Sequence, residues 1–191
     1  MSNQIFECES YDSVNEAGQR FARGTYDNCT FTDCNFSETD FTLNIFMECR
    51  FERCDLSMAA LHNTGLRDVT FVDCKLQGVN FSVCNDFLLA LSFEKCQLNL
   101  ASFQGVPLKG MRFDDCSLHE TDFTEANLEK AVFDRCDLNR AVFEQTNLSG
   151  ADFRSAVNYA IDPTQNRLRK AKFSLHGLPG LLTQSGIEIF D

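Results

Sequence analysis

Residues 126–155 read ANLEK AVFDR CDLNR AVFEQ TNLSG ADFRS, six consecutive blocks of five residues that share one pattern. Each block begins with a small residue and carries Leu or Phe at its third position. A period of five fits neither an α-helix, with about 3.6 residues per turn, nor a flat strand with alternating side chains. The stretch therefore predicts a solenoid whose corners recur every five residues.

The same pattern extends towards the N-terminus, with one interruption. Its large residues are Phe21, Tyr26, Phe31, Phe36, Phe41, Phe46, Phe51, Leu56, Leu61, Leu66, Phe71, Leu76 and Phe81, and after a slip of two residues it resumes at Phe93 and runs to Phe153. Residues two apart in extended backbone point the same way, so each block sends one large and one small side chain inward. The slip predicts a bulge in residues 84–91, where we expect Phe87 or Leu88 to take the missing inward position. Such a bulge is either a local irregularity or a surface projection that contacts a partner.

A second period of twenty residues indicates four faces per coil. One face repeats Phe at every coil and the next repeats Cys at its small position; the columns comprise Phe51, Phe71, Phe93, Phe113 and Phe133, and Cys54, Cys74, Cys96, Cys116 and Cys136. Identical side chains on successive coils pack as ladders about 4.8 Å apart, so about seven coils give a rod on the order of 35 Å long. The fold class predicted is all-β: a right-handed quadrilateral β-helix.

Ten cysteines raise the question of metal binding or disulfides. Most of them occupy the inward small position, where a free thiol packs as a small hydrophobe. No pair of Cys-x-x-Cys motifs, glycine-rich phosphate loop or His-Glu-x-x-His motif is found, so we expect no metal site, no cofactor and no catalytic residues. The N-terminal residues lack the pattern of a signal peptide, and no stretch is long and apolar enough for a membrane span; with ten cysteines this favours a cytoplasmic protein with reduced thiols.

The chain carries 28 acidic and 17 basic residues, a formal net charge of −11. Phosphates would be repelled by this charge, which argues against direct binding of nucleic acid. Glu94, Asp114 and Asp134 occupy the same outward position on three successive coils, where like charges oppose folding. Together with other carboxylates of the same half they form the candidate partner-binding surface: Glu94, Asp114, Asp115, Asp122, Glu125, Asp134 and Asp137. The alternative interpretation is that these carboxylates form a solvated surface that only keeps the stacked coils soluble.

The repeats fade after Phe153, so we divide the chain into a β-helix, residues 1–158, and a C-terminal segment, residues 159–191. A solenoid end exposes its last coil and has to be capped. The apolar residues of the segment predict a cap or a two-fold dimer contact. The dimerisation residues expected are Phe173, Leu178, Leu181, Leu182 and Ile187.

Blocks such as Ala126-Asn127-Leu128-Glu129-Lys130 and residues 151–155 resemble the pentapeptide-repeat family, whose consensus is A-(D/N)-L-x-x, over roughly residues 19–158. The run Tyr159…Ile161-Asp162…Asn166…Lys170-Ala171-Lys172-Phe173-Ser174-Leu175…Gly180-Leu181-Leu182 is similar to the C-terminal signature of the Qnr-type quinolone-resistance proteins and, more closely, of the albicidin-resistance pentapeptide proteins. Residues 91–96 (LSFEKC) and 72–75 (VDCK) resemble the latter too. The long projecting loops of the Qnr type are replaced here by the two-residue slip.

The resemblance implies a DNA-mimicking protein that dimerises through its C-terminus, binds DNA gyrase, a type II topoisomerase, and protects the enzyme from a gyrase-targeting antibiotic or toxin such as albicidin or a quinolone. The alternative is an acidic structural or scaffold protein with no topoisomerase role. An enzyme is a third hypothesis and would need a pocket at the bulge.

Overall fold

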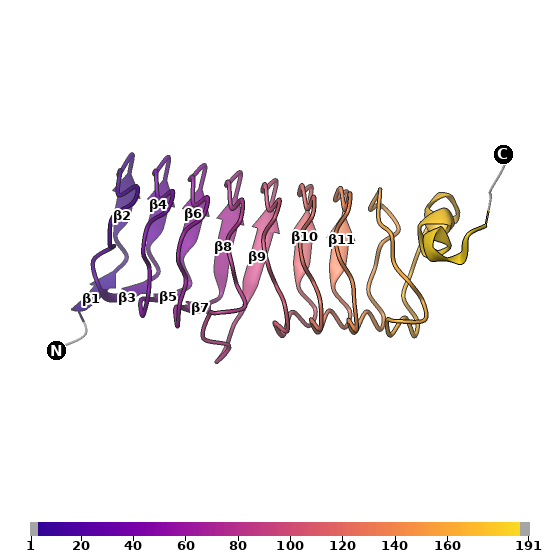
Figure 1. The fold of residues 1–191 in the computed structure, drawn as a ribbon. Helices are drawn as coiled ribbons and strands as arrows, with labels where there is room; N and C mark the ends of the chain where they lie inside the picture. The colour runs from indigo at the N-terminus through magenta and orange to yellow at the C-terminus, as the bar shows by residue number, and fades with distance from the viewer. Residues whose placement is uncertain (1–3, 188–191) are drawn as a thin grey trace.

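The protein is an all-β solenoid whose coils stack along one axis, with a C-terminal segment of 3-10 helix closing the far end (Figure 1). The computed structural model describes residues 4–187. The all-β, four-faced solenoid predicted from the periods of five and twenty residues is confirmed. Within residues 4–187, no helix has the length and apolar character needed to cross a membrane.

Parallel strands form two of the four faces. Face 1 carries a four-stranded sheet built from β1 (Gln4–Glu7), β3 (Gly24–Asp27), β5 (Ile45–Met47) and β7 (Gly65–Arg67). Face 2 carries a seven-stranded sheet built from β2 (Ser10–Asp12), β4 (Thr30–Thr32), β6 (Arg50–Glu52), β8 (Val69–Val72), β9 (Leu91–Glu94), β10 (Arg112–Asp114) and β11 (Val132–Asp134). Faces 3 and 4 come next in each coil, and single parallel bridges such as Asn35↔Asp55 and Asp40↔Ala60 join them between coils.

The chain turns at the last residue of most blocks, and this residue takes a left-handed backbone conformation. Positive φ angles recur with the repeat, for example at Asp33 (53°), Glu48 (51°) and Lys130 (60°). This conformation costs a residue with a side chain roughly 1 kcal/mol or more. The stacking of coils offsets that cost, because the N–H of Glu48 donates to the carbonyl of Arg67 one coil on, at 2.9 Å. Each corner is therefore held by the coil that follows it.

The Phe column of face 2 runs through the core as a stack of nearly parallel rings. Phe113 lies 5.4 Å from Phe93 and 5.0 Å from Phe133, with interplanar angles of 7° and 3°. Rings of the opposite face 4 meet this stack edge-on, as Phe103 and Phe123 do at 5.9 Å from Phe113. Stacked and edge-to-face pairs both stabilise a core beyond the area they bury. The inward direction predicted for the Phe column is confirmed.

The Cys column of face 3 is buried as predicted and forms a second ladder. Each thiol donates to a carbonyl of the preceding coil, as Cys54 does to Phe31 and Cys136 does to Phe113, both at 3.4 Å. The thiols thus satisfy backbone carbonyls while they fill the space of a small side chain. Cys49 occupies the small inward position of the neighbouring column, and burial raises the pKa of its thiol to about 12. Of the cysteines, Cys8 alone is exposed.

The two-residue slip lies at the corner between faces 1 and 2. The expectation that Phe87 or Leu88 points inward is wrong, because their side chains are 61% and 63% exposed. Leu89 instead packs against the core, partly buried. Leu88 takes the left-handed corner conformation (φ 59°), and the extra residues are absorbed after it, before the register resumes with Val69↔Leu91. The corner sequence alone could not reveal which side chain the longer turn directs inward.

Both ends of the solenoid extend beyond the repeats read from sequence. At the N-terminus β1 and β2 already pair in register, with Phe6 opposite Tyr26 and Tyr11 opposite Phe31. At the C-terminus the bridge Asp152↔Lys172 and the stacked pair of Phe153 and Phe173, 5.4 Å apart, continue the coil past residue 158. The terminal blocks lose the small inward residue or the regular spacing, which hid them from the pattern.

The Phe stack predicts a graded loss of stability along the rod. Phe113→Ala removes a fully buried ring with stacked neighbours on both sides, and we expect it to lower the free energy of unfolding by about 3–5 kcal/mol. Phe173→Ala is the control, since Phe173 ends the stack and is only partly buried. Urea denaturation followed by circular dichroism gives both values. Equal losses for the two variants would contradict the ladder as the main source of stability.

Candidate interaction surfaces

The acidic column predicted from sequence exists on face 2. Strand pairing places Asp114 opposite Glu94 on one side and opposite Asp134 on the other. Asp115 follows Asp114 at the left-handed corner (φ 56°). The structure therefore brings these four carboxylates together on adjacent coils.

Basic side chains are inserted into this column, so the repulsion expected between its carboxylates is largely relieved. Arg112 contacts Asp134 at 2.9 Å and Asp114 at 3.6 Å. Arg135 forms ion pairs with the same two carboxylates. A hydrogen bond from Ser155 and the two nearby guanidinium groups lower the pKa of Asp134. The column is thus a mixed network of charges rather than a bare row of carboxylates.

Asp152 continues face 2 beyond Asp134 and is the most strongly perturbed carboxylate of this network. Its side chain is 15% exposed and accepts bidentate hydrogen bonds from Arg154, the shortest at 2.8 Å. The Nζ of Lys172 lies 3.6 Å away. The hydrogen bonds from Arg154 hold the pKa of Asp152 at about 2.

The remaining predicted carboxylates lie on other faces. Asp137 is on face 3, where it contacts the His119 ring at 2.8 Å and the Asn158 amide at 2.8 Å. Partial burial opposes its ionisation, but these hydrogen bonds outweigh burial and lower its pKa. Asp122 and Glu125 are on face 4, opposite face 2 across the core. The seven predicted residues therefore do not form one surface.

Three carboxylates of face 4 lack basic partners. Among the described residues, Asp122, Glu125 and Glu144 take part in no ion pair, in contrast to Glu94, Asp114 and Asp134 on face 2. Asp122 and Glu125 belong to one coil, and Glu144 to the next, because Asp122 bridges to Val142. We call Asp122, Glu125 and Glu144 the acidic flank. The twenty-residue period places these residues on one face, and the ion pairs that neutralise carboxylates on face 2 are visible only in the structure.

The C-terminal segment folds over the last coil. Helix η1 (Leu175–Leu181) begins after Ser174, whose side chain caps the N–H of Gly177, and η2 (Thr183–Ser185) follows. Gly177 and Gly180 lie against the ring of Tyr159, so close that a side chain at either position would collide with this residue. Burial raises the pKa of Tyr159. These glycines allow the segment to cover the end of the core.

The predicted dimerisation residues divide into two groups. Phe173 and Leu181 are partly buried against the core and belong to the cap. Leu178, Leu182 and Ile187 are exposed by 41%, 38% and 58% and remain available to a partner. Sequence reasoning missed two further exposed apolar residues at this end, Val157 (51%) and Leu175 (80%). We call the exposed residues Val157, Leu175, Leu178, Leu182 and Ile187 the apolar end.

The described part of the chain offers no arrangement of side chains suited to bind a metal ion. In residues 4–187 no group of three or more His, Cys, Asp or Glu side chains is placed to hold a metal ion. The buried thiols stack one above another and each donates to a carbonyl, as Cys116 does to Phe93 at 3.6 Å.

Comparison with known proteins agrees with this architecture. The family described as pentapeptide repeat region matches residues 19–86, 44–123 and 86–153. The fold is similar to that of trypsin-treated QnrB1, a plasmid-mediated fluoroquinolone resistance protein, with a TM-score of 0.63, 19% identity and 98% of each chain covered. It is also similar to HetL from the cyanobacterium Nostoc sp. strain PCC 7120, a protein involved in regulating heterocyst differentiation, with a TM-score of 0.64, 19% identity and coverage of 90% of this chain and 86% of that one. No curated protein matches the sequence.

The pKa of Asp152 predicts a pH-dependent contribution to stability. Because its folded pKa, about 2, lies below the unfolded value of about 3.9, the contribution is present above pH 4 and is lost as the pH falls towards 2. Asp152→Asn should therefore lower the free energy of unfolding at pH 7 by about 1 kcal/mol or less, because the Arg154 side chain is 65% exposed and water screens the pair. Thermal unfolding of both proteins at pH 7 and pH 2 tests this. A difference that persists unchanged at pH 2 would refute the assignment.

Proposed function

Because the chain belongs to the pentapeptide-repeat family, we propose that it is a DNA-mimicking protein that binds DNA gyrase and protects this enzyme from a gyrase-targeting antibiotic or toxin. The observation that carries the proposal is the acidic flank, a set of carboxylates without basic partners on one face of a narrow, straight rod. A type II topoisomerase holds duplex DNA on a basic surface, and a rod with rows of carboxylates offers that surface a similar pattern of charge.

The acidic flank supports the contact better than the column on face 2. Arg112 and Arg135 already neutralise much of the field of Asp114 and Asp134. Asp122, Glu125 and Glu144 have no such partners among the described residues, so their charge extends further into solvent. Long-range attraction of a basic partner depends on this uncompensated field and is screened by salt. We therefore place the primary gyrase contact on face 4.

The sequence resemblance supports the choice of gyrase. The C-terminal run from Tyr159 to Leu182 is similar to that of the Qnr-type and albicidin-resistance proteins, and QnrB1, which shares the fold, is a fluoroquinolone resistance protein. The resemblance is closer to the albicidin-resistance type, and the slip in residues 84–91 takes the place of longer loops. We therefore propose albicidin, ahead of quinolones, as the inhibitor class to test.

The proposal predicts a charge-dependent rescue of gyrase. Supercoiling by gyrase in the presence of albicidin, or of a quinolone in a parallel series, should recover as this protein is added. Asp122→Lys with Glu125→Lys and Glu144→Lys should raise the concentration needed for half-maximal rescue by at least about tenfold, because the basic partner would then be repelled. The same variant should show weaker binding to gyrase in a pull-down at low salt.

The matched control is the triple variant Glu94→Lys, Asp114→Lys, Asp134→Lys on face 2. We expect it to keep more of the rescue, since those carboxylates are largely paired within the chain. A larger loss from the face 2 variant would move the contact to that face, where the sequence first predicted it. No binding and no effect on supercoiling by the unaltered protein would refute the gyrase proposal and favour an acidic scaffold.

We further propose that two copies of the chain dimerise through the apolar end. An exposed apolar patch at the end of a soluble rod marks an interaction site, and a two-fold contact buries the same patch on both copies. Leu178, Leu182 and Ile187 provide the patch, while Phe173 and Leu181 hold the cap on which it rests. Such a dimer doubles the length of the acidic rod.

Leu178→Glu combined with Leu182→Glu should remove this contact, because four charges would be buried at the two-fold interface. Both side chains are exposed, so the cap itself should stay folded. Sedimentation velocity at equal concentration should give the double variant at most half the mass of the unaltered protein. Val142→Glu is the control, as Val142 is exposed by 38%, like Leu182, but lies on face 4. An unchanged mass in the double variant would place the dimer contact elsewhere.

A further inference from the structure

The outward side chains of face 1 are sorted by charge along the rod. The half built from β1, β3, β5 and β7 is acidic, and the half that follows the slip is basic; the members are Glu7, Asp27, Glu48 and Asp68 in the first half and Lys109, Lys130, Arg167, Arg169 and Lys170 in the second. Three residues depart from this rule, and one of them, Asp86, lies at the slip itself. Arg67 lies over the Phe87 ring at 5.2 Å, and Glu129 pairs with Lys109 at 3.0 Å.

Most of these charges have no partner within the chain. Among the described residues, neither the four acidic members nor Arg167, Arg169 and Lys170 take part in an ion pair. On face 2, by contrast, Arg112 and Arg135 bind the carboxylates beside them. Lys109 and Lys130 share Glu129, at 3.0 and 3.9 Å, and the two blocks of face 1 keep net charges of opposite sign.

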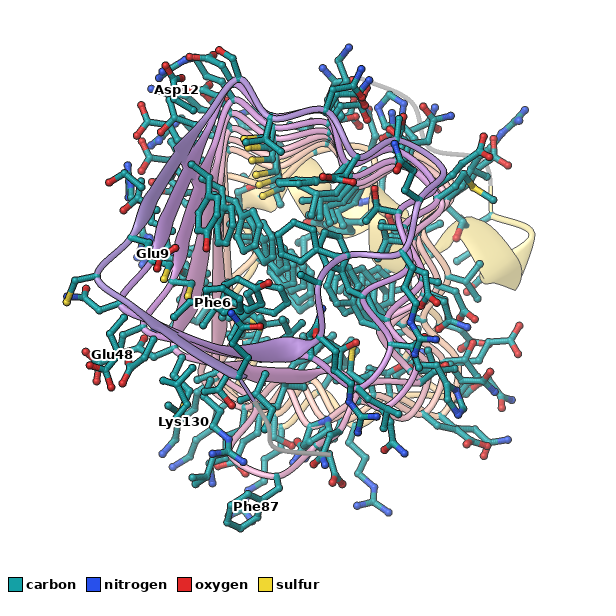
Figure 2. The ribbon with its side chains drawn as sticks, turned by 90° about the vertical axis from the view of Figure 1, so that its left-hand side faces the viewer. Phe6, Glu9, Asp12, Glu48, Phe87 and Lys130 are labelled. Carbon is teal, nitrogen blue, oxygen red and sulfur yellow. The ribbon has the colours of Figure 1, made fainter. Side chains whose placement is uncertain are left out.

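An apolar projection stands at the boundary between the two blocks. Phe87 and Leu88 are 61% and 63% exposed, and Asn85 fixes the turn by accepting a hydrogen bond from the Phe87 N–H at 2.9 Å. Viewed along the rod, Glu48, Phe87 and Lys130 project from the same side of the molecule (Figure 2). In Figure 1 the projection is the loop below β7 and β8, at the middle of the rod.

We propose that face 1 is a contact surface between two copies of this chain, which lie side by side and antiparallel. The two-fold axis lies in the plane of the contact, is perpendicular to the rods and passes through the projection. It places each column of side chains opposite the same column of the other copy, running in the reverse direction. The acidic block of each copy then faces the basic block of the other.

In this arrangement Glu48 faces Lys130 and Glu7 faces Arg169, whereas Arg67 faces Lys109. Leu88 lies at the axis in the column of left-handed corner residues. Two coils before it is Glu48 and two coils after it is Lys130, so these side chains face each other between copies. In the same column Cys8 of the first coil faces Lys170 of the last. Phe87 and Leu88 of both copies meet at the axis and bury their exposed surface.

A second copy fits this face better than an unrelated partner. The net charge of face 1 changes sign at one point along the rod, and Phe87 and Leu88 lie at that point, as a two-fold antiparallel pair requires. A parallel pair would place acid against acid and base against base, which is destabilising. This contact uses a different surface from the apolar end. Where both contacts form, each lateral pair presents two apolar ends in opposite directions, and the rods assemble into a linear array.

Charge exchange between two variants tests the pairing. The experiment uses the full chain with Leu178→Glu and Leu182→Glu, so that the lateral pair is the largest assembly. One variant carries Glu48→Lys and Asp68→Lys, and the other carries Lys109→Glu and Lys130→Glu. Each alone should sediment as a monomer, because the side chains at positions 48 and 130 then carry the same charge and face each other between copies. Mixed at a one-to-one ratio, they should form a heterodimer, since positions 48 and 130 then carry opposite charges at both of their contacts.

A cross-link reports the orientation. Cys8 is the exposed cysteine, and within one chain it is separated from Lys170 by eight coil spacings, about 38 Å. A short maleimide–succinimide reagent should therefore join Cys8 to Lys170 only between antiparallel copies, as peptide mass spectrometry of the cross-linked dimer would show. A dimer formed through the apolar end places the two Cys8 residues at its far ends and cannot yield this link. The cross-link is measured without gyrase, so its outcome is independent of whether the protein rescues gyrase.

The proposal is supported if the link appears in the parent protein, disappears in each charge variant and returns in the mixture. Absence of the link in the parent overturns it, as does its persistence in either variant at the level of the parent. A mixture that stays monomeric also overturns it. Melting curves of the variants by circular dichroism serve as the control for folding, since all four substituted side chains lie outside the core. Phe87→Ser with Leu88→Ser should weaken the parent dimer at least about tenfold by removing the apolar centre.

Discussion

The structure depends on hydrogen bonding between the backbones of successive coils. Once each residue is bonded to its counterpart about twenty positions along the chain, every coil has to close after four blocks and every corner has to turn within one residue. The left-handed conformation at Glu48 and Lys130 follows from this constraint, and the bond from each corner to the next coil compensates its cost. Identical side chains are then brought into register, which produces the Phe stack and the buried thiols of the core.

The same register governs the surface. Charges that repeat every twenty residues are placed above one another, so like charges accumulate unless a basic residue is inserted between them. Face 2 contains such residues, because Arg112 and Arg135 bind the carboxylates on either side. Face 4 leaves Asp122, Glu125 and Glu144 unpaired, and face 1 separates its two signs into opposite halves of the rod. Three faces with one backbone therefore present three different fields to a partner.

The two places where the register is interrupted provide the apolar features of the surface. At the slip, the longer corner lifts Phe87 and Leu88 into solvent and leaves Leu89 to fill the core. At the C-terminus, the glycines beside Tyr159 let η1 close the last coil while Leu178 stays exposed. Most large side chains of the regular coils point inward, although Met58 and Leu100 are exposed at corners.

The sequence by itself determined the solenoid, its four faces and its core, because a period of five repeated in register leaves a single way to bury Phe113 and Cys116. It also placed Glu94, Asp114 and Asp134 in one column, since alignment between coils follows from counting residues. Only the tertiary structure decided which carboxylates are free, because an ion pair depends on side chains such as Arg135 reaching across coils. It also decided the direction of Phe87, because an irregular corner follows no period. It decided where the rod ends as well, since Phe173 stacks on Phe153 although the sequence repeat can no longer be recognised there.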